Sequence, residues 1–291
     1  MVILNFELRI MNFELRNIFW GLSMILLTAC EVIPVGEQDK VIFTPVDSSA
    51  VERTSLLIEY SGWRCVNCPT AAEEAHHLKE LYGENLVVVV MHPETNPNTS
   101  YTNAAGKPNE AVNYTCPEAD SIYIMMGGTK ETAFPTGNIN LLKNDSKSYF
   151  TEYSTWGKYI SQAYSNPQPV VINQEVKGTA DSKDINIVVD ITNHDTKAIE
   201  ATLQVWLTED SVMGRQDGAP DPKNYAHNHI MRASISPLWG DIMPIEAHMT
   251  EQQVYRYPLP EKVVKENCNI VALVSVNGEV VQATETKISI E

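Results

Sequence analysis

The period of the hydrophobic pattern changes about halfway along the 291-residue chain. Continuous apolar runs at residues 56–60 and 86–91 predict two buried strands, and apolar positions recur at helical spacing between them. Helical spacing returns at residues 115–126 and again at residues 156–164. Strands that alternate with helices are typical of an α/β unit with parallel strand pairing. The first half therefore predicts such a domain over residues 53–166.

Beyond residues 167–169 (Pro-Gln-Pro), apolar and polar residues alternate one by one. Residues 185–191 and 203–207 follow this period of two, and the dipeptide Asn277-Gly278 separates two further strand-like runs. Asn-Gly between such runs is the strongest short-range signal for a β-hairpin. Short strands without helices predict an all-β, immunoglobulin-like sandwich over residues 167–291.

The N-terminal residues 1–30 have the pattern of a lipoprotein signal peptide. The apolar run at residues 18–27 is too short to span a bilayer, and it ends in Leu-Thr-Ala-Cys, which matches a bacterial lipobox. We expect Cys30 to be lipidated and residues 31–52 to form a tether. The alternative is an ordinary secretory signal in which the cysteine at this place is a coincidence.

The formal charge of −16 comes from 37 acidic against 21 basic residues. Because binding to a phosphate backbone needs a basic surface, nucleic acid is not expected as a partner. No apolar run after the signal is long enough to cross a membrane. The lipid anchor implies an extracytoplasmic compartment, where cysteine pairs can form disulfides.

Two cysteines, Cys65 and Cys68, stand where the first predicted strand meets the first predicted helix. A helix N-terminus carries unpaired N–H groups and partial positive charge, which stabilise a thiolate. Arg64 adds a cation next to Cys65. We therefore expect Cys65 to be an accessible nucleophile and Cys68 to resolve the mixed disulfide that forms on it.

Other interpretations of this cysteine pair stay open. Half a zinc site would need a second Cys or His pair at ligand spacing, and Cys116 and Cys268 are isolated. A static disulfide could simply staple the turn. His227 and His229 could bind a metal with a nearby acid, or be structural, and we assign no metal site and no cofactor. Cys116 and Cys268 are either free thiols or an unpredicted pair.

Glu59 and Pro135 suggest a thioredoxin-like first domain. Glu59 lies six residues before Cys65, where a thioredoxin has a buried acid that accepts a proton from the second cysteine. Pro135 precedes a strand-like run, where thioredoxins place a cis-proline that presents backbone to substrate. Each has an ordinary alternative, because Glu59 could face solvent on an edge strand and Pro135 could be trans.

Taken together, these motifs resemble the twenty-eight-kilodalton outer-membrane protein family of the Bacteroidetes. The resemblance rests on the lipobox, residues 62–69 (Gly-Trp-Arg-Cys-Val-Asn-Cys-Pro), residues 207–210 (Leu-Thr-Glu-Asp) and residues 227–229 (His-Asn-His). It implies a thioredoxin-like domain followed by a β-sandwich, lipid-anchored at the outer membrane on the periplasmic face or the cell surface. The Val-Asn between the cysteines departs from ordinary thioredoxins, so the direction of electron flow is not implied.

Two functions from different classes follow. The first is a thiol–disulfide oxidoreductase of the cell envelope that acts on protein thiols or disulfides, with Cys65 as nucleophile, Cys68 as resolving thiol, Glu59 as proton carrier and Pro135 as backbone contact. The second is a non-enzymatic surface lipoprotein, adhesin-like or receptor-like, that binds a partner through the sandwich loops. In that case the cysteine pair is a fixed staple.

Overall fold

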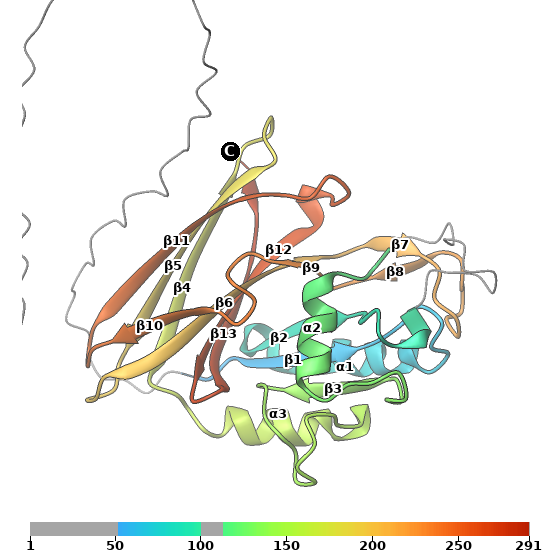
Figure 1. Cartoon of the computed structure of the whole chain (residues 1–291), viewed down its shortest axis with the longest axis horizontal. Helices are drawn as coiled ribbons and strands as arrows, with labels where there is room; N and C mark the ends of the chain where they lie inside the picture. Colours follow the sequence, from blue (N-terminus) through green and yellow to red (C-terminus); the bar gives the residue numbers. More distant parts are fainter. Residues whose placement is uncertain (1–51, 100–112, 291) are drawn as a thin grey trace, which may run out of the picture. The chain divides into compact units, whose positions relative to one another are not determined.

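The structure is a computed structural model that describes residues 52–99 and 113–290 (Figure 1). The predicted signal peptide, Cys30 and nearly all of the tether lie outside these residues. Within the described part, three α-helices occur, and the first two have Pro in their first turn, where its missing N–H is not needed. The helices are α1 (Cys68–Tyr82), α2 (Pro117–Met125) and α3 (Trp156–Tyr164), with single 3-10 turns η1 (Gly83–Asn85), η2 (Pro97–Thr99), η3 (Tyr153–Thr155) and η4 (Lys265–Asn267).

Strands dominate the described residues. Those before α3 are short, whereas several of those after it run for nine or more residues. The strands are β1 (Ser55–Tyr60), β2 (Leu86–Met91), β3 (Thr136–Ile139), β4 (Val170–Gly178), β5 (Asp184–Asn193), β6 (Ile199–Glu209), β7 (Val212–Gly214), β8 (Tyr225–His227), β9 (Ile230–Ser234), β10 (Asp241–Ile245), β11 (Thr250–Pro258), β12 (Cys268–Val276), β13 (Glu279–Lys287) and β14 (Ser289–Ile290).

One eight-stranded sheet joins the two halves of the chain. Its order is β13-β12-β6-β9-β2-β1-β3, with β10 paired to β6, so strands far apart in sequence lie side by side (Figure 1). The junction between the halves is the pairing of β2 with β9, in which the Val90 N–H donates to the His229 carbonyl at 2.8 Å. A four-stranded sheet in the order β11-β5-β4-β14 and the hairpin β7-β8 complete the strand pairing.

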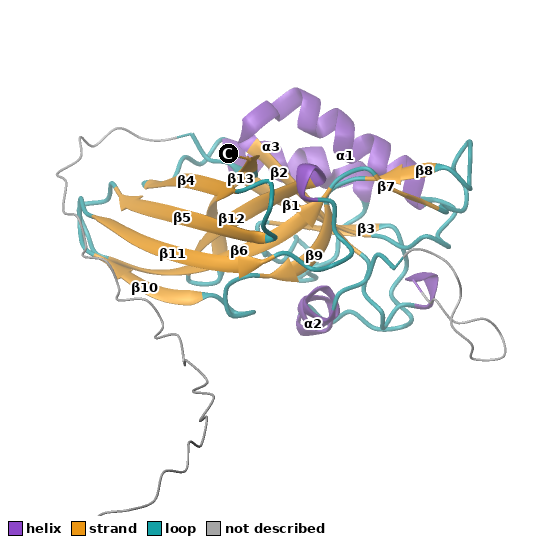
Figure 2. Cartoon of the chain, turned by 90° about the horizontal axis from the view of Figure 1, so that it is seen from above, coloured by secondary structure: helices purple, strands orange, loops and turns teal. Residues whose placement is uncertain are grey.

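Hydrophobic cores lie on both faces of the large sheet. One core joins it to the four-stranded sheet through β5, β6 and β12, with Ile187, Leu203 and Ile270 among the fully buried residues. Near β1 and β2, α1 and α3 cover one face and α2 covers the other, as Figure 2 shows. The continuous apolar runs of β1, β2 and β12 follow from this arrangement, because both of their faces are buried.

The predicted fold class, a thioredoxin-like α/β domain followed by an immunoglobulin-like sandwich, is wrong. In a separate α/β domain, all strands of the sheet would come from that domain. Here β9, β6, β12 and β13 from the second half extend the sheet of β1 and β2. A sandwich would expose the outer face of each sheet, whereas β12 is buried on both faces. The predicted ranges 53–166 and 167–291 stay predictions; residues 165–169 link α3 to β4. No helix in residues 52–99 or 113–290 is long and apolar enough to cross a membrane.

Candidate thiol site

The turn between β1 and α1 holds the two predicted redox cysteines. Cys65 and Cys68 form a disulfide, with their sulfur atoms 2.19 Å apart. Cys68 is the first residue of α1 and Cys65 lies three residues earlier, so the pair sits at a helix start as predicted. The turn is closed by the Cys65 N–H, which donates to the Gly62 carbonyl at 2.9 Å, and by the Cys68 N–H, which donates to the Cys65 carbonyl at 3.3 Å.

The predicted accessibility of Cys65 is wrong for this conformation. Cys65 is 5% exposed and Cys68 2%, although the intervening Val66 is 63% exposed. Residues 215–224, which connect β7 to β8 and which we call the covering loop, pack against this turn. No spacing or motif in the sequence places this loop on a turn about 150 residues away.

The covering loop donates hydrogen bonds to backbone carbonyls of the cysteine turn. The Gln216 Nε2 donates to the Cys65 carbonyl at 2.9 Å and to the Gly62 carbonyl at 3.2 Å. The Asp217 N–H donates to the Trp63 carbonyl at 2.7 Å. Gly218 has φ +84°, and a Cβ there would lie 2.1 Å from the Val66 carbonyl oxygen, so the approach requires glycine.

Glu59 lies beneath this turn and is 1% exposed. It belongs to β1, which pairs with β2 on one side and β3 on the other, so it is not on an edge strand. Burial raises the pKa of its carboxyl from 4.5 to about 8, while the charge of His229 and a hydrogen bond with Ser61 oppose the rise. Glu59 is therefore mostly protonated at neutral pH and can donate a proton.

A small cavity connects Glu59 to the disulfide. Its volume is about 30 Å³, and it brings together side chains from α1, β1, β8 and the covering loop. Its lining consists of Glu59, Ser61, Cys68, Ala72, Val90, His92, Gln216, Tyr225, His227 and Asn228. The carboxyl of Glu59, whose pKa is about 8, thus lines the same cavity as the second cysteine.

Pro135 lies at the same end of the sheet as the cysteine turn. The Phe134–Pro135 peptide bond is cis. Pro135 precedes β3, whose Thr136 is opposite Tyr60, the last residue of β1. It does not line the cavity with Glu59 and Cys68.

His92, which no sequence motif singled out, and His227 also line this cavity. His92 follows β2 directly, is buried, and its ring lies 5.7 Å from that of His227 between centroids. Burial lowers the pKa of His227 to about 4, against a hydrogen bond with the Arg215 carbonyl. A histidine directly after a buried apolar run was the available signal for His92, because the end of such a strand is inside the protein.

The remaining predicted metal and thiol candidates lie apart. His229 has φ 57° and faces Asp210 and Glu285 instead of sharing a strand face with His227. Among the described residues, no three His, Cys, Asp or Glu side chains are grouped so as to hold a metal ion. Cys116 and Cys268 are free, buried thiols that belong to different hydrophobic cores.

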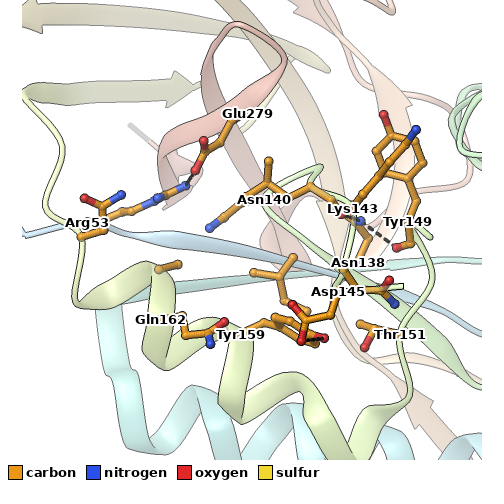
Figure 3. A pocket seen from close by; sticks show the side chains of 15 residues that line it. Arg53, Asn138, Asn140, Lys143, Asp145, Tyr149, Thr151, Tyr159, Gln162 and Glu279 are labelled. Atoms are coloured by element: carbon orange, nitrogen blue, oxygen red, sulfur yellow. Dashed lines mark hydrogen bonds and ion pairs between the residues drawn. The ribbon is translucent and has the colours of Figure 1, made fainter. Parts of the chain in front are cut away.

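A larger cavity lies away from the cysteines (Figure 3). Its volume is about 250 Å³, and it is surrounded by β3, α3 and the segment that joins them. Polar side chains at its wall include Arg53, which pairs with Glu279 at 2.7 Å. No cysteine lines it.

These features define a β-rich protein with a disulfide at a helix start above a buried acid. The family model "Outer membrane protein Omp28" matches residues 128–291, more than half of the chain. The chain therefore belongs to the Omp28 family of outer membrane proteins, which confirms the resemblance seen in the sequence. The family places the protein at the outer membrane, as predicted.

The solved structures similar to this chain include two from Porphyromonas gingivalis. HBP35 of Porphyromonas gingivalis is 16% identical with a TM-score of 0.61, covering 81% of this chain and 76% of its own, which shows a shared fold. A domain of the outer membrane lipoprotein Omp28 from Porphyromonas gingivalis is 21% identical over 43% of this chain and 91% of its own, with a TM-score of 0.33. No curated protein matches the chain.

Proposed function

We propose that this outer membrane protein exchanges thiols and disulfides at Cys65 and Cys68. Its partners in this proposal are protein thiols or disulfides, and lipid attachment at Cys30 holds the protein on the membrane. The observation that carries the proposal is the shared cavity of Glu59 and Cys68, with the pKa of the acid near neutral pH. A disulfide that only staples a turn has no need of a buried acid beside its second sulfur.

The exchange follows from the positions of these groups. A substrate thiolate attacks the Cys65 sulfur, the Cys65–Cys68 bond breaks, and a mixed disulfide forms on Cys65. Cys68 leaves as a thiolate and takes a proton from Glu59. A second substrate thiolate then attacks the substrate sulfur of the mixed disulfide and releases Cys65 as a thiolate, so the substrate dithiol is oxidised and the protein disulfide is reduced. The same steps in reverse reduce a substrate disulfide.

Access to Cys65 requires the covering loop to move. Three of the hydrogen bonds that hold it come from Gln216 and Asp217. Each such bond contributes on the order of 1 kcal/mol net, so opening the loop is compatible with turnover. Pro135, at the same end of the sheet, then presents backbone to a substrate segment.

The proposal is tested by disulfide formation in a reduced model protein. Cys65→Ser should abolish exchange, and Glu59→Gln should slow it by about 100-fold through loss of proton transfer. When Cys68→Ser is given a substrate disulfide instead, the Cys65 thiolate attacks it, one substrate thiol leaves, and the other stays trapped on Cys65 as a mixed disulfide. Cys116→Ala and Cys268→Ala are matched controls, since both thiols are buried outside the site. Exchange that survives both Cys65→Ser and Cys68→Ser contradicts the proposal.

A second candidate function is non-enzymatic binding of a partner, with the disulfide as a staple. The burial of Cys65 under the covering loop favours it. In this case wild-type protein shows no exchange, and the Cys65→Ala/Cys68→Ala double variant loosens the loop. Faster hydrogen exchange at the Asp217 amide, which donates to Trp63, measures that loosening. The whole chain is used, because its two halves share one sheet.

A further inference from the structure

His92 is a buried polar side chain whose ring nitrogens have no hydrogen-bond partner among the described residues. It is 1% exposed, and neither Nδ1 nor Nε2 has a hydrogen-bond partner in the described part of the chain. Burial, and then the charges of His227 and Arg232, lower the pKa of His92 well below its usual range. Its imidazole is therefore neutral, with one N–H donor and one acceptor nitrogen. Leaving either buried and unpaired costs about 1–3 kcal/mol.

Glu59 also has a buried polar atom without a hydrogen-bond partner, and it lines a cavity together with His92. Its Oε2 is buried without a hydrogen-bond partner, and both Glu59 and His92 line the cavity that also contains Cys68. The cavity volume is about 30 Å³. A single water needs roughly 10–15 Å³ of such space and two or more polar partners. The cavity is therefore large enough for one water, which can bridge the His92 ring and Glu59 Oε2.

We propose that a water in this cavity bridges the His92 ring N–H and Glu59 Oε2, and that His92 is a positioning residue for the proton of Glu59. The inference rests on the proposed function and adds a residue to it. When Cys68 takes the proton of Glu59, a buried carboxylate remains. The His92 N–H donates to the water, and the water donates to that carboxylate, so His92 keeps its own proton throughout. Hydrogen bonds to the charged form of an acid favour ionisation.

Other groups that face His92 define what a substitution must leave intact. Its ring lies 5.3 Å from Tyr114 and 5.7 Å from His227 between centroids, and Arg232 acts on it through its charge. The titratable and charged groups around it are Glu59 from β1, Tyr114 before α2, Tyr225 and His227 from β8, and Arg232 from β9.

The test is the titration of Glu59 in the oxidised full chain, followed by its carboxyl carbon in NMR. This readout does not depend on exchange activity. His92→Phe removes both nitrogens and should raise the midpoint from about 8 by about 1 or more, a tenfold weaker ionisation. His92→Asn keeps a donor and an acceptor and should restore a midpoint close to wild type. His77→Phe, on the exposed surface of α1, is the matched control.

Unchanged or lower Glu59 midpoints in folded His92→Phe overturn the inference. If His92→Phe does not fold, a high-resolution crystal structure of the wild type decides, because a cavity without a water within hydrogen-bond distance of both His92 and Glu59 overturns it too. A raised Glu59 midpoint in His92→Phe, together with no disulfide exchange by the wild type, supports the hydrogen-bonded bridge and contradicts the proposed function. Exchange that His92→Phe leaves unchanged at every pH, with an unshifted midpoint, contradicts the bridge alone.

Discussion

Two interior regions of this protein are built on opposite principles. Between the two sheets, aliphatic side chains such as Ile187, Leu203 and Ile270 are fully buried against one another. Below the cysteine turn, an acid and a histidine are buried just as deeply, and Glu59 Oε2 and both His92 nitrogens have no hydrogen-bond partner among the described residues. The first region stabilises the fold through apolar burial, at about 25 cal/mol per Å².

The second region contributes no such apolar stabilisation. Unpaired buried polar atoms cost about 1–3 kcal/mol each, and sites where the rules of packing are broken are where function is expected. In the proposed function, Glu59 and His92 serve the chemistry beside Cys68 and not the stability of the fold. Substitutions in the two regions should therefore have opposite consequences.

The largest effect is expected from the ionisation of Glu59. Its pKa is about 8 in the folded protein against 4.5 ordinarily, so the folded state holds the proton more tightly. The stability that this provides is complete below about pH 4.5 and is lost as pH rises to about 8. At about 1.4 kcal/mol per pKa unit, wild type should lose about 4 kcal/mol relative to Glu59→Gln between about pH 5 and pH 9. Urea unfolding of both proteins across this range measures it, and a pH-independent difference contradicts it.

A cavity in the apolar region should cost somewhat less and leave the site alone. Leu203→Ala should lower the free energy of unfolding by about 3 kcal/mol because the packed sheets cannot fully collapse around the missing atoms. The Glu59 titration midpoint should stay about 8. Ile242→Ala on the neighbouring β10 is the control, since Ile242 is 70% exposed and its loss should change stability by less than about 0.5 kcal/mol. A shifted Glu59 midpoint in Leu203→Ala would mean that the two regions are not independent.

The smallest effect is expected from disturbing the covering loop. Gly218→Ala places a Cβ against the Val66 carbonyl and strains a residue with positive φ, by about 1–2 kcal/mol. The displaced loop should expose the disulfide and speed its reduction by a phosphine about tenfold. Gly278→Ala is the control, because its φ of +82° imposes the same strain where a Cβ meets nothing within 4 Å. Equal reduction rates in both variants would show that the loop does not limit access.

Much of the local structure could be predicted from the sequence. The helix after the cysteines, the buried strand at residues 86–91 and the hairpin at Asn277-Gly278 are confirmed, because periodicity and turn residues act over short distances. The predicted arrangement of these elements in two separate domains was wrong. The pairing of β2 with β9 rests on one pair, Val90 and Ile230, which no local pattern encodes. The unbroken apolar run at residues 270–274 was a usable sign that β12 is buried on both faces.

The candidate site divides in the same way. Cys65, Cys68 and Glu59 are neighbours in sequence, and β1 and the start of α1 bring them together through local geometry. His92, Gln216 and the covering loop reach the site through tertiary contacts alone. The prediction that Cys65 is accessible was wrong because of such a tertiary contact. The covering loop, which packs on the cysteine turn, lies about 150 residues further along the chain.

The most direct test of the exchange reaction is the reduction potential of the Cys65–Cys68 disulfide, measured on the full chain in thiol redox buffers. Exchanging pairs lie between about −270 and −120 mV, and structural disulfides lie below about −300 mV. We expect a value in the upper range. A value below about −300 mV would contradict the exchange reaction and leave the disulfide as a staple in a partner-binding protein.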